Sequence, residues 1–183
     1  METMKGSVRR ESLIGLPVII SGTGRKIGIV RELQLSENMN AVTGIYVSIG
    51  GIAKKGGLIP FRHIHSVDSH GIVVSPDFRD EVQNLPAAED NPGPDTLIGT
   101  PVVCQDGREL GRIADILIDL KKGRVAGVEI SEGFIDDLVD GRSLLPHVPA
   151  IHDAAGALIL TPEEAEAIRP CNKGIRNMFL NKL

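Results

Sequence analysis

Three histidines, His63, His65 and His70, are the residues of this chain whose type and spacing best suit metal or proton chemistry. Imidazole is the commonest metal ligand and the side chain that ordinarily titrates near neutral pH. In an extended segment His63 and His65 would share one strand face, with His70 beyond the next turn. A second, similar half of the chain has Pro149 and Ile151 at the first two positions. We therefore expect solvated surface histidines rather than a metal site.

A group of acidic side chains falls in one predicted hairpin loop of the second half. The group consists of Glu132, Asp136, Asp137 and Asp140. Clustered carboxylates suit hard cations such as calcium, but this spacing matches no calcium-binding loop. The pattern favours a solvated acidic tip. A sharper hypothesis pairs this loop with a basic patch, Lys54 and Lys55, at the corresponding place in the first half.

No motif for catalysis or for a cofactor is present in the sequence. The chain has no nucleophile elbow, no phosphate-binding loop, no Rossmann glycine triplet and no zinc-protease motif. Cys104 and Cys171 lie far apart, so they form neither a disulfide framework nor a zinc site. The interpretation is a non-enzymatic protein with no catalytic residues and no cofactor.

The charge of the chain argues against nucleic acid as a partner, and its apolar pattern makes a cytoplasmic protein the default expectation. The net charge is −4, whereas phosphate-backbone affinity comes from clustered lysine and arginine. No stretch approaches the roughly 20 apolar residues that a membrane-spanning helix needs, and no signal peptide is recognisable. Residues 13–74 carry six basic and three acidic side chains, against six and ten in residues 97–160. Complementary charge of this kind can steer docking of the halves or of different partners.

An internal repeat fixes the organisation that must position these residues. The segment at residues 13–18 returns at residues 97–102. Four further pairs follow in the same order: residues 24–28 with 107–111, 44–47 with 127–130, 59–60 with 145–146, and 72–76 with 158–162. Two copies of one small β module therefore make up most of the protein.

Alternation and turn signals predict the strands of each copy. Ile45, Val47 and Ile49 alternate with polar neighbours, which indicates a half-buried strand. Hairpins are predicted over residues 33–49 and 116–130. Glycines inside the strand patterns, Gly28 and Gly111, are typical of bulges that let a small sheet curl. The predicted fold is mainly β, with two tandem small barrels of five or six strands each.

A short α-helix is expected after each barrel. Ser75 and Thr161 suit the N-cap, and each precedes a proline at the first helical position. Thr161 and Glu164 form a capping box. The predicted division is an N-terminal extension at 1–12, repeat 1 with its helix at 13–84, a proline-rich acidic linker at 85–96, repeat 2 with its helix at 97–170, and a basic amphipathic helix at 171–183.

The C-terminal segment is the part outside the repeat with a pattern of its own. Apolar residues at helical spacing stand beside basic ones, including Ile175, Arg176, Met178 and Phe179. Such a helix packs on a barrel, docks on an acidic partner groove, or contacts a membrane surface.

The paired motifs resemble the PRC-barrel family, named for the photosynthetic reaction centre. The family elements read Leu13-Ile14-Gly15, Ile27-Gly28, Gly44-Ile45, Ile59-Pro60 and Ile72-Val73-Val74, and their counterparts stand in the second copy. The resemblance implies a six-stranded, partly open barrel that works as an adaptor. Members include the cytoplasmic domain of the reaction-centre H subunit and the C-terminal domain of a ribosome-maturation factor. Their transmembrane helix and extra domain have no counterpart here, so neither specific role is expected.

The sequence thus predicts a protein-interaction module with an unknown protein partner. Barrel surfaces, edge strands or the C-terminal helix would bind it, and a homo-oligomer is compatible with exposed strand edges. One alternative is a small-molecule or metal site in the cleft between the barrels. Another is a membrane-surface factor that contacts lipid through its basic tail.

Overall fold

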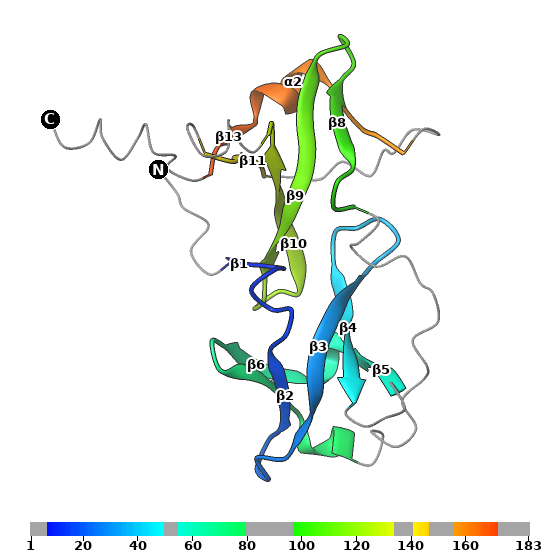
Figure 1. The fold of residues 1–183 in the computed structure, drawn as a ribbon, viewed down its shortest axis with the longest axis vertical. Helices are drawn as coiled ribbons and strands as arrows, with labels where there is room; N and C mark the ends of the chain where they lie inside the picture. Colours follow the sequence, from blue (N-terminus) through cyan, green and yellow to red (C-terminus); the bar gives the residue numbers. More distant parts are fainter. Residues whose placement is uncertain (1–6, 50–54, 80–96, 134–140, 147–155, 172–183) are drawn as a thin grey trace, which may run out of the picture.

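The computed structural model describes residues 7–49, 55–79, 97–133, 141–146 and 156–171. The chain forms two sheets, one for each copy of the repeat, with the first copy below the second in Figure 1. The fold is therefore mainly β and built as a tandem, as the repeat predicts.

The first sheet has six strands in the order β5-β4-β3-β2-β7-β6. Its strands are β2 (Pro17–Ile20), β3 (Lys26–Leu35), β4 (Val42–Ile49), β5 (Lys55–Pro60), β6 (Ile64–Asp68) and β7 (Gly71–Val74). Two short 3₁₀ turns, η1 (Phe61–His63) and η2 (Pro76–Arg79), complete this domain. The predicted helix after the first copy is thus a 3₁₀ turn where it begins, and its expected continuation to residue 84 lies outside the described residues.

The second sheet has seven strands, six of them in the order β12-β8-β9-β10-β11-β13. Its strands are β8 (Pro101–Cys104), β9 (Glu109–Asp119), β10 (Arg124–Ser131), β11 (Ser143–Leu145), β12 (Leu158–Leu160) and β13 (Arg169–Pro170), and the seventh is β1 (Ser7–Arg9). Helix α2 (Pro162–Glu166) follows β12. The capping box at Thr161 is confirmed, because its side chain accepts from the Glu164 N–H and the Glu164 carboxylate accepts from the Thr161 N–H.

The repeat extends to the register of the strands. In the first domain β2 pairs in parallel with β7, and Val18 faces Ile72. In the second domain β8 pairs in parallel with β12, and Val102 faces Leu158. The other pairings among the equivalent strands are antiparallel in both domains: β2 with β3, β3 with β4 and β4 with β5 in the first, and β8 with β9, β9 with β10 and β10 with β11 in the second. The two copies therefore share one topology.

Gly28 and Gly111 lie at the bulges that the sequence predicts. Each faces the strand before it directly beside a register shift, Gly28 opposite Val18 and Gly111 opposite Val102. A Cβ atom at Gly28 would collide with the backbone carbonyl of Ser48, and one at Gly111 with that of Ser131. The close approach of three strands at these points requires glycine in both domains.

Apolar side chains on the inner faces of both sheets form one buried cluster. Ile45 and Val47 are buried, as their alternation predicts, while Tyr46 and Ser48 on the other face are only half-buried. In the second domain the corresponding strands are buried on both faces, because Ile116, Asp115 and Glu129 are all buried. Something outside the repeat must cover the outer face there.

The covering element includes β1, which precedes the first domain in the chain but belongs to the sheet of the second. Ser7, Val8 and Arg9 pair antiparallel with Asp119, Ile118 and Leu117 of β9. Figure 1 shows β1 beside the lower ends of β9 and β10, from where the chain continues into β2. The predicted N-terminal extension thus contains a strand that ties the two domains together.

A second contact joins the turns of the two long hairpins. The Val42 N–H donates to the Gly123 carbonyl at 2.9 Å, and the Val125 N–H donates to the Asn40 carbonyl at 3.0 Å. Ala41 and Arg124 form an isolated antiparallel bridge between them. Backbone hydrogen bonds therefore connect the domains at two places.

No helix in the described part of the chain is long and apolar enough to cross a membrane.

Candidate interdomain binding site

Two buried carboxylates stand side by side on the outer face of the second sheet. Asp115 in β9 and Glu129 in β10 are direct cross-strand partners, next to a register shift between Glu129 and Ile130. Asp115 is 1% exposed and Glu129 is fully buried. Buried carboxylates are rare unless they are paired or hydrogen-bonded, so their partners define the site.

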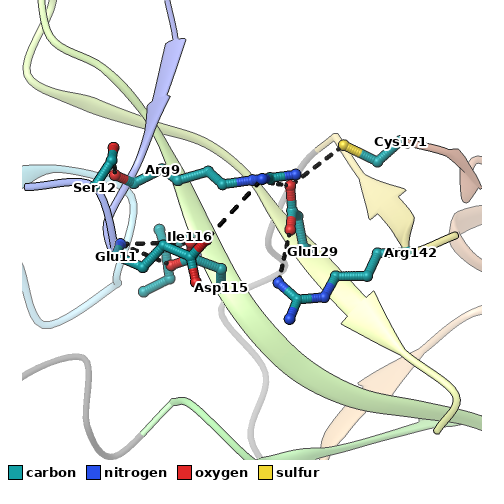
Figure 2. A network of polar contacts seen from close by, with 8 residues as sticks. All are labelled: Arg9, Glu11, Ser12, Asp115, Ile116, Glu129, Arg142 and Cys171. Atoms are coloured by element: carbon teal, nitrogen blue, oxygen red, sulfur yellow. Dashed lines mark hydrogen bonds and ion pairs between the residues drawn. The ribbon is translucent and has the colours of Figure 1, made fainter. Parts of the chain in front are cut away.

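Glu129 is held by two arginines from outside its own hairpin. The Arg9 Nε donates to Glu129 Oε1 at 2.7 Å, and an Arg142 guanidinium nitrogen donates to Oε2 at 3.2 Å (Figure 2). Both arginine side chains are about one third exposed, at 34% and 32%. Burial opposes the charge of Arg9, but the hydrogen bond and the charge of Glu129 outweigh it and raise the pKa of Arg9. Arg9 therefore keeps its positive charge in this contact.

Cys171 adds a thiol to the same carboxylate. Its Sγ lies 3.4 Å from Glu129 Oε1, on the far side of Arg9 from Asp115 in Figure 2. Burial raises the pKa of the Cys171 thiol, and the charge of Glu129 and the hydrogen bond to it raise that pKa further. The thiol is therefore protonated at neutral pH and acts here as a weak donor.

Asp115 is bound mainly by backbone groups. Its Oδ1 accepts from the Ile116 N–H at 2.8 Å, and both of its oxygens lie 3.4 Å from the Glu11 N–H. Burial raises the pKa of Asp115, and the charges of Glu11 and Glu129 add to this against the two hydrogen bonds. The carboxylate is therefore costly to ionise where it stands.

The three consecutive residues Arg9, Arg10 and Glu11 contact both domains. Arg9 reaches Glu129 of the second domain, while Arg10 forms an ion pair with Glu32 of the first, with 2.7 Å between Nε and Oε1. The Arg10 N–H also donates to the Ile116 carbonyl of the second domain at 2.8 Å. Strand β1 and the two residues after it are therefore a clamp across the domain boundary, and the acids that bind this clamp form the candidate site.

The arrangement is suited to recognition of an extended segment that carries an arginine. Strand β9 supplies the backbone edge, and the buried Glu129 selects a guanidinium by a charge-assisted hydrogen bond. These are the elements of strand addition, in which main-chain bonds give affinity and a side-chain pocket gives specificity.

The three histidines are not brought together as a cluster. His63 ends η1 and is half-buried, and its carbonyl accepts from the Ser75 N–H, whereas His65 lies exposed in β6. His70 is exposed in the turn after β6, with 3.6 Å between its Nδ1 and an oxygen of Asp68. Within the described residues no group of three or more potential ligands could hold a metal ion.

The other predicted interaction residues fall mostly outside the described residues. Those outside are Lys54, Asp136, Asp137, Asp140, Ile175, Arg176, Met178 and Phe179. Lys55 begins β5, but its side chain is not among those described. Glu132 is exposed just after β10. The proposed contact between the acidic loop and the lysines therefore stays a prediction.

A hollow of about 470 Å³ lies in the second domain, at the bulge of β8 and β9. Val102 and Val103 line it together with Glu109, Arg112 and Glu132. This hollow lies within the second domain, and the alternative of a ligand cleft between the barrels stays a prediction.

Sequence reasoning missed Arg9, Asp115 and Glu129. The signal was weak but present: Asp115 and Glu129 fall inside strands, and Glu129 stands where the first copy has Tyr46. An acid inside a strand next to apolar neighbours requires a partner, and the adjacent arginines Arg9 and Arg10 precede the repeat. Only the fold brings these residues together.

These features define a protein of two tandem, mainly β domains. They are joined by strand β1, which precedes the first domain in the chain and pairs with the sheet of the second. The model of the PRC-barrel domain matches the chain twice, over residues 5–80 and 94–166, and the chain belongs to this family. The first match begins before β1, so it includes the segment that clamps the second domain. A search of curated proteins found no match for the chain.

Proposed function

We propose that this protein is a non-enzymatic interaction module of the PRC-barrel family, which binds other proteins by adding an extended segment to one of its sheets. The observation that carries the proposal is the pairing of β1 with β9, because β1 comes from outside the repeat that it joins. A sheet that accepts one external strand has the backbone geometry to accept another. The expected cytoplasmic location is part of this proposal.

Strand β6 offers an edge for such a partner in the first domain. It ends the order of the first sheet, and within the described residues no strand pairs with its outer side. Ile64 and Val67 are half-buried, and the two residues between them are exposed at a register shift between β6 and β7. An edge strand of five residues, with apolar side chains half-buried against the sheet, is suited to strand addition. The curling of each sheet into a small barrel, which the bulges at Gly28 and Gly111 support, would leave this edge accessible.

Site-specific photo-cross-linking tests the proposal. A photoreactive residue replaces Ser66 in β6. In a matched control chain the same photoreactive residue replaces Thr23, which is exposed in the turn between β2 and β3. After irradiation in native cells, we expect one stoichiometric partner protein linked through position 66 and not through position 23. The same partner at both positions would contradict strand addition at β6, and no protein partner at either position would contradict an adaptor function.

Measurements on the purified chain test the two alternatives, a small-molecule or metal site and a membrane-surface factor. Native mass spectrometry would detect a bound small molecule or metal, for which the hollow at β8 and β9 is the natural location. Binding to anionic liposomes that requires residues 172–183 would favour the membrane-surface factor. Either result without a protein partner would replace the proposed function.

A further inference from the structure

We propose that the clamp formed by β1 is exchanged between two copies of this chain, so that residues 7–79 of one copy dock on the second domain of the other. Strand β1 then pairs with β9 of the second copy, and Arg9 binds the second copy's Glu129. The inference rests on the proposed interaction function, since it uses the same strand addition, and it names a second copy of this chain as the partner.

The division of the contacts along the chain supports exchange. Every interdomain contact described above has one side before residue 80 and the other side after residue 96: β1 with β9, Arg9 with Glu129, Ala41 with Arg124. The 17 residues at 80–96 separate the two sides in the sequence. Cutting the molecule there leaves two units whose docking surfaces are complete, and either unit finds the same surface on a second copy.

The composition of the predicted linker is compatible with contact between copies. Residues 85–96 include Pro86, Pro92 and Pro94. Proline-rich linkers are semi-rigid spacers, which fold back on themselves less readily than glycine-rich ones. At about 3.3 Å for each extended residue, twelve residues of such a linker can reach about 40 Å, which is longer than a small domain is wide. The linker therefore permits both the closed chain and the exchanged pair.

Strand β1 of the clamp is short enough to detach from β9 without unfolding of the core. Strand β1 has three residues, all half-buried rather than buried. A short edge strand is marginal alone and opens at a lower free energy than the core strands. What gives it specificity is the ion pair with Glu129, whose carboxylate is fully buried while the Arg9 side chain is one third exposed. Incoming segments without an arginine at this position would leave that buried charge with one partner fewer.

Disulfide trapping on the full chain tests the exchange. Ser7 and Asp119 face each other, and the neighbouring hydrogen bond from the Arg10 N–H to the Ile116 carbonyl makes theirs a non-hydrogen-bonded pair, in which side chains are closest. A Ser7→Cys chain is mixed with a ¹⁵N-labelled Asp119→Cys chain, and cross-linked peptides are identified by mass spectrometry. We expect a disulfide between the labelled and unlabelled chains whose yield rises with protein concentration.

The matched control is the double variant, Ser7→Cys with Asp119→Cys in one chain. We expect it to close within the chain at low concentration, which shows that the geometry permits the bond. If this control closes but the mixed single variants give no interchain bond at any concentration, the exchange proposal is wrong.

A complementation experiment tests the ion pair without introduced cysteines. An Arg9→Ala chain and a Glu129→Ala chain each lack the pair, but an exchanged heterodimer restores it once, from the intact Arg9 of one chain to the intact Glu129 of the other. We expect about tenfold more heterodimer than either homodimer by native mass spectrometry, in line with the coupling of charged hydrogen-bonded pairs. A statistical mixture would contradict exchange through this pair. Both experiments use only this protein, so their failure would leave a partner captured at position 66 unaffected.

Discussion

The two PRC-barrel domains of this chain share a backbone but differ in what covers their outer faces. At equivalent places in the long hairpin the first domain has Glu32 beside Tyr46, and the second has Asp115 beside Glu129. Glu32 and Asp115 both accept from the next residue's N–H, at 2.7 and 2.8 Å. Tyr46 is only half-buried and its hydroxyl accepts from Gln34, whereas Glu129 is fully buried beneath two arginines.

The difference teaches that the side chain opposite the acid decides how fully this face is covered. Arg10 binds Glu32 beside a half-buried Tyr46, whereas Glu129 is buried completely. A tyrosine at this position tolerates water at its polar tip. A buried glutamate cannot remain without partners, because an isolated charge away from water is strongly destabilising. The second domain therefore depends on Arg9, which precedes the first domain in the sequence.

The largest effect is expected from Glu129→Ala. The change leaves Arg9 and Arg142 without their shared carboxylate. Breaking a buried pair costs about 3 kcal/mol here, at the low end of the range, because both arginine side chains are partly exposed. Urea unfolding measures the loss. In the first domain Tyr46→Phe removes one 3.4 Å hydrogen bond and is expected to cost about 0.5 kcal/mol. Equal losses in the two variants would remove the contrast between the domains.

The next effect concerns what the domains have in common. Gly28→Ala and Gly111→Ala both place a methyl group against a backbone carbonyl, so each is expected to lower the free energy of unfolding by about 2 to 3 kcal/mol. Gly111 should lose more, because its φ of +114° is also unfavourable for alanine. The control is Gly107→Ala, at φ +90° with open space around it, which should cost only about 1 kcal/mol. A control that matches the loss at Gly28 would show that the collision is not the cause.

A pH-dependent effect is expected for Asp115→Asn. The pKa of Asp115 is raised by burial, so its ionisation destabilises the folded chain as the pH rises from about 4 through the folded-state pKa. The stability of the asparagine variant relative to the wild type should increase over that window and then level off. The gain is about 1.4 kcal/mol for each tenfold difference in acid dissociation constant between the folded and unfolded chains. Unfolding free energies between pH 3 and pH 8 measure it, and a difference that does not vary with pH would contradict the assignment.

The smallest effect compares the segments that follow the two sheets. Thr161→Ala removes the side-chain half of the capping box at α2, in which the hydroxyl accepts from the Glu164 N–H, and should cost about 1 kcal/mol. Ser75→Ala removes two long, exposed hydrogen bonds, one accepted from the Asp77 N–H at 3.4 Å and one donated to the Asp77 carboxylate at 3.3 Å, and should cost about 0.3 kcal/mol. Hydrogen exchange at Glu164 and Asp77 reports each change locally. Faster exchange at Asp77 than at Glu164 would reverse the ranking.

The repeat made most of the fold predictable, because local signals placed the strands. Alternation gave β4, the paired glycines gave the bulges, and Thr161 gave the start of α2. The site was not predictable in the same way, since Arg9 and Glu129 are 120 residues apart in the sequence. Nothing local says that a segment before the first domain pairs with the second. The charges of the acidic loop are close together in sequence, so a local pattern predicts them, whereas Asp115 and Glu129 are single acids within apolar strands.

The position of β1 also has a consequence for synthesis of the chain. A ribosome makes Ser7–Arg9 long before β9 and β10, and at 5 to 20 residues per second the strand waits on the order of 10 s for its partner. The first domain can fold during that time, but the second sheet gains its seventh strand only after residue 131 has emerged. Such a long-range closure is slow. During the wait the exposed arginine of one nascent chain can meet the finished second domain of a neighbour on the same messenger, which makes polysomes the place where pairing between copies would begin.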